Sequence, residues 1–279
     1  MTTIHDQMLS EEEVRAHYDL GNEFFALFLD PSMAYSCAKF NTPQSTLAEA
    51  QQAKIDLSLS KCDLKPGLRL VDVGCGWGAV AMRAREVYKA NVIGLTVSRN
   101  QWRYATERAR GIDGIEFRCQ NWEDFSEPVD RVVSIGAFEH FGRQQYDAFF
   151  RKFRSLLAPD GVMMLHTITY GKPDTSFKFL RFIAFISREI FPGGDIPTPE
   201  RVVDAARRAG FELRHVEGLR EHYARTLDTW AANLESNQHE AIRLAGDEVY
   251  RKYMKYLTGC AGLFRGGQCN VHQFTLKVS

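Results

Sequence analysis

Three glycines within five residues, in the stretch LVDVGCGWGAV at positions 70–80, constrain the fold of this sequence more than any other feature. Glycine loses more backbone entropy on folding than other residues, so three glycines directly after an apolar run indicate a turn that needs bare backbone. A glycine-rich turn between the first strand of a parallel sheet and the next helix is typical of a nucleotide-like cofactor site. A tight strand–helix turn without a ligand is the competing interpretation.

The spacing of the loop distinguishes between cofactors. Residues 72–78 read D-x-G-x-G-x-G, whereas dinucleotide-binding folds carry G-x-G-x-x-G and an acidic residue about 20 positions further on. This sequence has the uncharged residues Gly-Leu-Thr at 94–96 instead. S-adenosylmethionine (SAM) carries no phosphate and needs close backbone packing beside its methionine part. The pattern therefore disfavours NAD and favours SAM.

Composition and charge narrow the class of protein. The 279 residues include 35 basic and 35 acidic side chains, whereas nucleic-acid binding needs a basic excess. No apolar run reaches the roughly 18–20 residues of a transmembrane helix, and the N-terminus does not resemble a signal peptide. Six cysteines without a C-x-x-C pair give no zinc or disulfide pattern. We expect a cytoplasmic protein with no metal site, no nucleic-acid partner and no transmembrane segment.

The order of strand and helix patterns predicts an α/β fold. Strand patterns at 68–73, 91–97, 114–119, 130–138 and 161–168 alternate with helix patterns at 77–88, 100–110 and 145–157. Strands separated by single helices predict a mostly parallel sheet. Residues 211–217 and 271–278 alternate like an antiparallel pair at one edge, and residues 221–257 read as two helices above the sheet.

The residues before the first strand read as helices. Ser10 with Glu13, and Thr46 with Glu49, have the spacing of capping boxes. The aromatic-rich segment between them predicts a short helix interrupted at Pro31.

A second aromatic stretch, SFKFLRFIAFISREIF at 176–191, has two interpretations. The first is a helix buried against the sheet. The second is a segment whose aromatic residues line a channel for an apolar substrate, or contact a membrane surface.

Several blocks of the sequence together resemble one family. The blocks are HYDLGNEFFALFLDPSMAYSCAKF, VDVGCGWGA, NVIGLTVSRNQ, VDRVVSIGAFEHFG, MLHTI, EIFPGG, HYARTLDTWAANLE and YRKYMKYLTGCAGLFR. From about residue 17 to the C-terminus they are similar, in order, to the mycolic acid cyclopropane synthases, within the wider cyclopropane-fatty-acid synthase family of SAM-dependent methyltransferases. The resemblance implies a Rossmann-like class I SAM-dependent methyltransferase fold, with a mostly parallel seven-stranded sheet, an α-helical N-terminal lid and a helical cap insertion.

The resemblance also implies how the single methyltransferase domain, 1–279, is divided. Residues 1–60 would form the helical lid and residues 61–170 the SAM-binding α/β core. Helical substrate-binding elements would cover 171–210 and 218–262. The edge strands would be 211–217 and 268–278.

Carried over position by position, the resemblance implies which residues contact SAM. They are Tyr35 and Ser36 at its amino-acid end, Asp72, Gly74, Gly76, Trp77 and Gly78 in the loop, Thr96 and Gln101 at the ribose, Trp122 and Glu123 at the adenine, and Ile135 and Gly136 at the methionine part. The pair Thr96 and Gln101 would take the place of the acidic residue found in dinucleotide folds.

The family's reaction implies a second set of residues. Methyl transfer to a cis double bond of a long acyl chain leaves a carbocation, and loss of a proton from the new methyl group closes a cyclopropane ring. Such a site needs a dry apolar tunnel and one well-placed base. In the family a bound bicarbonate is that base, and the positions matching its ligands are Cys37, Glu139, His166, Tyr223 and the backbone of Ile135. Glu139 would orient His166 or accept the bicarbonate hydroxyl, while His166, Tyr223 and the Ile135 amide would donate hydrogen bonds to anionic oxygen.

Cys260 matches a cysteine sometimes assigned as catalytic in the family. Because the alkene itself is the nucleophile, a packed cysteine beside the acyl channel is the competing interpretation. The resemblance also places His17 and Tyr18 in the lid over the cofactor, and His140 near the bicarbonate.

One departure concerns the acceptor. Only YGKPDT, at 170–175, stands where the mycolic acid enzymes carry a longer insertion near the substrate entrance. A shorter acyl chain, on a carrier protein or in a phospholipid, therefore competes with a full-length meromycolate as the acceptor, and peripheral membrane contact is compatible with it. The sequence also leaves open a methyl-branched or hydroxylated product, a methyltransferase for a small apolar metabolite, and a SAM-binding protein without activity.

Overall fold

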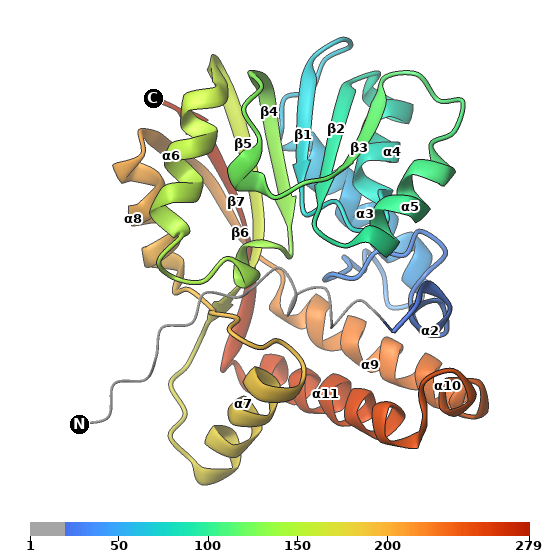
Figure 1. The fold of residues 1–279 in the computed structure, drawn as a ribbon. Coiled ribbons are helices and arrows are strands. Elements are labelled where there is room, and N and C mark those ends of the chain that lie inside the picture. Colours follow the sequence, from blue (N-terminus) through green and yellow to red (C-terminus); the bar gives the residue numbers. More distant parts are fainter. Residues whose placement is uncertain (1–19) are drawn as a thin grey trace.

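A seven-stranded sheet lies at the centre of the computed structural model, which describes residues 20–279 (Figure 1). The strand order is β3-β2-β1-β4-β5-β7-β6. The strands are β1 (Arg69–Val73), β2 (Asn91–Thr96), β3 (Ile115–Cys119), β4 (Val129–Ile135), β5 (Leu157–Tyr170), β6 (Phe211–Gly218) and β7 (Cys269–Val278). The predictions for Ser10, Glu13, His17 and Tyr18 lie outside the described residues.

Strands β1 to β5 pair in parallel, and β7 pairs antiparallel with both β5 and β6. The predicted mostly parallel seven-stranded sheet is therefore confirmed. One detail differs: β7 lies between β5 and β6, so of these two predicted edge strands only β6 is at an edge. Because β7 is an inner strand, each of its residues is buried or partly buried.

Helices cover both faces of the sheet and its lower end in Figure 1. They are α2 (Asn22–Ala26), α3 (Leu47–Ser60), α4 (Ala79–Tyr88), α5 (Arg99–Arg108), α6 (Tyr146–Leu156), α7 (Phe177–Glu189), α8 (Pro199–Arg208), α9 (Arg220–Ser236), α10 (Gln238–Ala245) and α11 (Asp247–Gly266), with the short 3₁₀ helices η1 (Trp122–Asp124) and η2 (Phe138–His140). Helices α6 and α8 pack on one face, and α3, α4 and α5 pack on the other. Helices α2, α9, α10 and α11 form a separate layer, which we call the cap.

Each layer has its own apolar core. Phe149, Phe150 and Phe153 of α6 are fully buried against the sheet, at about 1.5–3 kcal/mol for each side chain. In the cap, Phe24 of α2 and Trp230 of α9 are fully buried within a cluster that also includes Trp77 of the glycine loop. The cap is thus packed directly onto the loop that ends β1.

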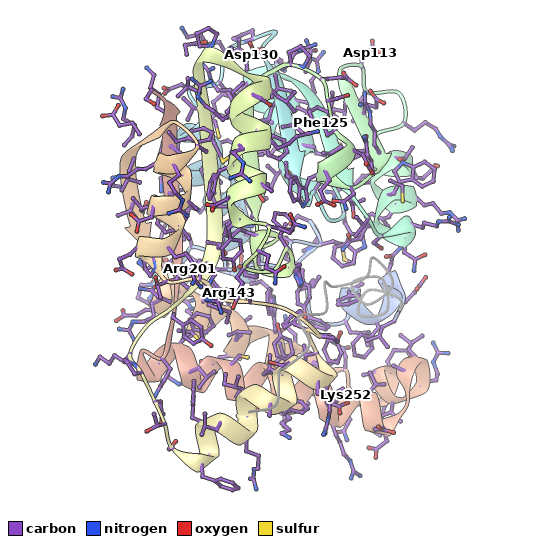
Figure 2. All side chains as sticks on the ribbon, turned by 60° about the vertical axis from the view of Figure 1, so that its left-hand side comes forward. Asp113, Phe125, Asp130, Arg143, Arg201 and Lys252 are labelled. Atoms are coloured by element: carbon purple, nitrogen blue, oxygen red, sulfur yellow. The ribbon has the colours of Figure 1, made fainter. Side chains whose placement is uncertain are left out.

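The cap faces the carboxyl ends of the parallel strands. Asp130, at the start of β4, lies at the far end of the sheet, whereas Lys252 of α11 lies in the cap (Figure 2). Ligands of open α/β sheets bind at the carboxyl ends of the strands. The space between sheet and cap is therefore where a site is expected.

Two of the helix predictions can be compared directly with the structure. The capping box at Thr46 is confirmed, because the Glu49 backbone N–H donates to the Thr46 hydroxyl and the Thr46 N–H donates to the Glu49 carboxylate at 2.8 Å. The prediction of two helices over 221–257 is wrong, because α9, α10 and α11 occupy this segment. Gly246, with φ of +86°, separates α10 from α11 by adopting backbone geometry that a continuing helix excludes.

Helix α7 has no buried residue, so the interpretation of 176–191 as a helix buried against the sheet is wrong. Phe177 is 78% exposed and Leu180 is 54% exposed. In Figure 1 the helix lies beside α11, at the opposite end of the molecule from α6. In the part of the chain that the structure describes, no helix combines the length and the apolar character needed to cross a bilayer.

Candidate active site

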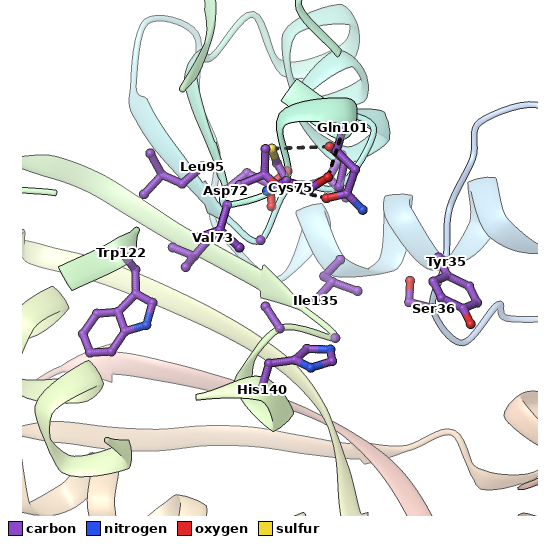
Figure 3. Close-up of a pocket in the computed structure, with 18 of the residues that line it drawn as sticks. Tyr35, Ser36, Asp72, Val73, Cys75, Leu95, Gln101, Trp122, Ile135 and His140 are labelled. Carbon is purple, nitrogen blue, oxygen red and sulfur yellow. Dashed lines mark hydrogen bonds between the residues drawn. The ribbon is translucent and has the colours of Figure 1, made fainter. Parts of the chain in front are cut away.

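The first pocket lies at the carboxyl ends of β1, β2 and β4, below the glycine loop (Figure 3). Its wall contains every residue predicted to contact SAM except Gly78. Gly78 packs elsewhere, because a Cβ at this position would lie 2.6 Å from the Phe117 ring. The structure therefore assembles the predicted set around one cavity, and places Gly78 in helix–sheet packing.

The remaining loop glycines have different structural reasons. Gly76 has φ of +54°, and a Cβ there would meet no atom within 4 Å, so it would extend into open space. Gly74 has φ of +81°, and a Cβ there would lie 2.3 Å from the Cβ of Ala137. Gly74 thus allows the turn after β1 to approach the turn after β4, whereas Gly76 leaves its backbone uncovered beside the cavity. Such a cradle fits a ligand that packs closely on main chain.

Two buried charged residues lie in this pocket. Asp72, at the end of β1, is 1% exposed, and one of its carboxylate oxygens has no hydrogen-bond partner among the described residues. Burial raises the pKa of Asp72 to about 7, with opposition from the cation of Lys54. Burial likewise lowers the pKa of Lys54 to about 8. An unpartnered buried carboxylate beside a cavity suits the ammonium group of an amino-acid ligand.

Helix α3 holds the loop that carries Tyr35 and Ser36. The Lys54 ammonium donates to the Ser36 hydroxyl at 2.7 Å. The Gln51 amide donates to the backbone oxygens of Ala34 and Ser36 at 3.1 and 2.8 Å. Both α3 side chains are buried. The loop therefore reaches the pocket through buried hydrogen bonds, which are costly to leave unmade.

The other predicted cofactor residues form the far wall of the first pocket. The Thr96 hydroxyl donates to the Gln101 side-chain oxygen at 2.8 Å, so these two residues are already paired with each other. Trp122 is buried against Phe141 and Phe149 and gives the wall a flat aromatic surface. A hydrogen-bonding pair beside an aromatic wall is suited to a nucleoside.

The second pocket lies between the sheet end and the cap, with α7 along one side. The five predicted catalytic residues, Cys37, Glu139, His166, Tyr223 and Cys260, all line it. They come from the loop before α3, from η2, β5, α9 and α11. Ile135, whose backbone was predicted to join them, lines the first pocket instead, whereas its neighbour Gly136 lines both.

Glu139 is held by one carboxylate oxygen only. Its Oε1 accepts the backbone N–H of Ile168 at 2.6 Å, and its buried Oε2 has no hydrogen-bond partner among the described residues. Burial raises the pKa of Glu139 to about 7, although the hydrogen bond from Ile168 opposes the rise. A carboxyl group with this pKa can accept or donate a proton near neutral pH.

The ring of His166 has a hydrogen-bond partner on β7. Its Nδ1 lies 3.2 Å from the Gln273 amide nitrogen, and no hydrogen bond joins it to Glu139. The two predicted roles of Glu139, to orient His166 or to accept the bicarbonate hydroxyl, stay predictions, although the partner of His166 Nδ1 is Gln273. Burial, with the nearby cations of Lys54 and Lys61, lowers the pKa of His166 well below its ordinary value. The ring is neutral at neutral pH.

The two thiols and the Tyr223 hydroxyl in the second pocket are uncharged. Burial raises the pKa of Cys37 and Cys260 far above that of a free thiol, so neither is a thiolate. The Tyr223 ring packs on Phe264 at 4.6 Å between centroids. No residue in the range 20–279 hydrogen-bonds the Tyr223 hydroxyl.

The two pockets share part of their walls. Tyr35, Ser36, Gly136 and His140 line both, and Figure 3 shows the side chains of Tyr35, Ser36 and His140 at the edge of the first pocket. Burial lowers the pKa of His140 to about 4, so this histidine is neutral. The two pockets are therefore direct neighbours, separated by a common wall.

Sequence reasoning missed Lys54, Gln51 and Gln273. A signal for the first two was present, because Gln51, Lys54 and Ser58 have the helical spacing of one face that also carries apolar residues. Polar side chains on a buried face need partners, and each of these three donates at least one hydrogen bond. Gln273 had no such signal, since its partners come from other elements.

Comparisons with known proteins identify relatives of this chain. A family model described as mycolic acid cyclopropane synthetase matches residues 5–274. Cyclopropane mycolic acid synthase 1 of Mycobacterium tuberculosis is 52% identical over 275 residues, which cover 95% of this chain and 96% of that protein.

Two solved structures match the whole fold. The cyclopropane synthase MmaA2 from Mycobacterium tuberculosis has a TM-score of 0.95 and 48% identity, covering 98% of this chain and 100% of the other. Mycolic acid cyclopropane synthase CmaA1 complexed with SAH and CTAB has a TM-score of 0.94 and 50% identity, with the same coverage. The predicted resemblance and the predicted methyltransferase fold are both confirmed.

Proposed function

This chain belongs to the mycolic acid cyclopropane synthetase family, and we propose that it closes a cyclopropane ring on a cis double bond of a long unsaturated acyl chain. Its similarity to these relatives identifies the chain as a SAM-dependent methyltransferase. The observation that carries the proposal is the wall shared by the two pockets, at Tyr35, Ser36, Gly136 and His140. It lets a donor and an acceptor react in a site shielded from water.

The first pocket fits SAM, which supplies an electrophilic methyl group when bound. Gly76 leaves backbone open to the ligand, and the unpartnered oxygen of Asp72 offers an acceptor for its ammonium group. Thr96 and Gln101 would bind the ribose, beside the aromatic wall formed by Trp122. The loop carrying Ser36 is held in place by Lys54.

The inner end of the second pocket fits a small oxyanion, and the family implies bicarbonate, which supplies a base. Glu139 Oε2 has no hydrogen-bond partner among the described residues, and Tyr223 lines the same cavity. Because the pKa of Glu139 is about 7, the carboxyl can share a proton with an oxyanion. Cys37 and His166 complete the set as neutral hydrogen-bond donors.

The outer part of the second pocket fits a hydrocarbon chain. Its wall is mostly apolar and comes from β5, α7, the segment after α7, α9 and α11, at Ile168, Ile183, Ile186, Phe191, Leu227, Leu263 and Phe264. An apolar channel that leads to a polar end suits an acyl chain carrying its reactive double bond some distance from the head group.

Helix α7 suits delivery from a lipid surface. Its exposed side presents Phe177 and Leu180 together with the basic residues Lys178, Arg181 and Arg188. Apolar and basic side chains on one exposed helix favour an anionic bilayer surface. The inner side of the same helix lines the second pocket through Ile183 and Ile186. A lipid held at this surface would thus lie at the channel.

The proposal is tested by incubating the purified chain with SAM and cis-monounsaturated acyl substrates of several lengths. Each substrate is offered as a carrier-protein thioester and within phospholipid vesicles. We expect products heavier by one methylene unit per modified chain. No methylene gain with any acyl substrate, together with methylation of a small apolar metabolite, would contradict the proposal.

A further inference from the structure

A buried hydrogen-bond network lies behind His166, on the side away from the second pocket. Gln273 of β7 is fully buried and contacts three residues. Its Oε1 accepts from the Lys61 ammonium at 2.7 Å, and its Nε2 lies 3.0 Å from the Ser58 hydroxyl and 3.2 Å from His166 Nδ1. Lys61 directly follows α3 and also pairs with Glu217 of β6 at 2.6 Å.

Two independent contacts determine which end of the Gln273 amide faces His166. The Lys61 ammonium has only donors, so the atom beside it must be the amide oxygen. The Ser58 hydroxyl gives its single proton to the backbone oxygen of Lys54 at 2.8 Å, so its oxygen accepts from the amide nitrogen. Reversing the amide would place donor against donor at Lys61. The NH₂ group therefore faces His166.

The orientation of the amide determines where His166 carries its proton. The NH₂ group has two hydrogens, of which one goes to Ser58 and the other points at His166 Nδ1. A hydrogen on Nδ1 would oppose it, so Nδ1 accepts. The one proton of the neutral ring is then on Nε2, and His166 lines the second pocket.

We infer that Gln273, held by Lys61 and Ser58, is a positioning residue that sets the tautomer of His166 and keeps its Nε2–H directed to the second pocket as a hydrogen-bond donor. The inference rests on the proposed function, because it gives His166 the task of holding an oxygen of the acceptor site. In this tautomer neither ring nitrogen can take a proton from the substrate. His166 therefore donates a hydrogen bond, and proton removal falls to another group.

The first test reads the tautomer directly. The whole chain, labelled with ¹⁵N-histidine, is examined by NMR at neutral pH, and the His166 signals are assigned by their loss in His166→Gln. We expect an unprotonated Nδ1 and a protonated Nε2. A protonated Nδ1 in the wild-type chain would overturn the inference.

The second test changes the partner. In Gln273→Glu a carboxylate of the same size still accepts from Lys61 but no longer donates, so the His166 proton should move to Nδ1. We expect kcat to fall about 10²-fold, with KM and SAM affinity within a few fold. Gln238→Glu, the same change on exposed α10, should alter neither the spectrum nor kcat. An unchanged His166 spectrum in Gln273→Glu would overturn the inference.

Two variants of Lys61 test the same inference if Gln273→Glu fails to fold. Lys61→Met releases the amide oxygen and should give a mixture of His166 tautomers, whereas Lys61→Arg retains a donor and should restore the wild-type spectrum. A single wild-type tautomer in Lys61→Met would count against the role of Lys61. If the wild-type chain forms no acyl product, the proposed function fails, while the NMR spectrum still decides the tautomer.

Discussion

The two pockets of this enzyme are assembled in different ways. The first is built largely from strand ends and the turns that follow them, with the glycine loop at its centre. The second takes its five predicted catalytic side chains from five elements spread between residues 37 and 260. The glycine loop at the centre of the first pocket is thus a single short segment, whereas the second pocket exists only after the sheet and the cap have packed together.

The electrostatics of the two pockets differ as well. The first contains a buried acid and a buried base, Asp72 and Lys54, each of which favours the charged form of the other. The second contains Glu139, whose pKa is shifted by burial and hydrogen bonds, with no cation of the described residues contributing. We expect the first to prefer a ligand with separated charges, and the second to work with neutral donors and one shared proton.

We expect the largest difference between the two pockets when Glu139 is substituted, because turnover should fall while SAM affinity is retained. Glu139→Gln keeps the volume and the acceptor for the Ile168 N–H but cannot exchange a proton. Turnover should fall about 10³-fold, while SAM affinity measured by calorimetry stays within a few fold. Equal losses of turnover and of SAM binding would mean that the pockets do not act separately.

The complementary change concerns the first pocket. Gly76→Ala adds a methyl group to backbone with φ of +54° that borders the cavity. SAM affinity should fall at least about tenfold, which corresponds to roughly 1.4 kcal/mol.

The matched control is Gly67→Ala, at φ of +83° with no atom within 4 Å of the added Cβ and outside both pockets. It carries a similar backbone cost of about 1–2 kcal/mol in stability but should leave SAM affinity unchanged. Equal affinities in the two variants would show that Gly76 has no ligand contact.

The glycine loop of the first pocket could be interpreted from the sequence alone, for a physical reason. A strand, a glycine turn and a helix interact with their sequence neighbours, so the loop at 70–78 could be interpreted locally. The contacts of Gln273 with His166, Ser58 and Lys61 join elements that are far apart in the chain. The positions of Cys37, Glu139 and Tyr223 were obtained through the family resemblance.

The helical segments show the same limit. The exposure of α7 could not be decided from its composition, because an apolar helix can be buried or can serve as a surface. The break at Gly246 was missed since the flanking segments have continuous helical character. The face of α3 with Gln51, Lys54 and Ser58 could have been found, because polar residues recur there at helical spacing.

The buried carboxyl group of Glu139 in the second pocket should make the free energy of unfolding depend on pH. The folded-state pKa of Glu139, about 7, exceeds its unfolded value of about 4.5, so the folded protein binds more protons between these values. Its contribution to the free energy of unfolding therefore decreases as the pH rises from 4.5 to 7.

Glu139→Gln removes this pH dependence. Relative to wild type, the variant should gain stability across that interval, by up to about 3 kcal/mol, as measured by urea unfolding at several pH values. A difference that does not change with pH would show that the carboxyl is not desolvated.

A smaller effect is expected on α7. Phe177→Ser with Leu180→Ser should weaken sedimentation with anionic vesicles several-fold and leave turnover of a soluble acyl thioester nearly unchanged. Val87→Ser removes another exposed apolar side chain, 47% exposed on α4, and should not alter vesicle binding. If both variants sediment like the wild type, α7 does not contact the bilayer.

The smallest effect is expected at Cys260. Its buried thiol is protonated, and in the proposed reaction the alkene is the nucleophile, so Cys260→Ser should retain turnover within a few fold. Complete loss of turnover in a folded Cys260→Ser variant would give the thiol a chemical role.

The central claim is that a methyl group from the first pocket becomes a ring carbon in the second. It is tested most directly by supplying SAM with a fully deuterated methyl group and examining the lipid product by mass spectrometry and NMR. We predict two retained deuterium atoms on the new carbon of a cyclopropane ring. Three retained deuterium atoms, or a product without ring resonances, would contradict this claim.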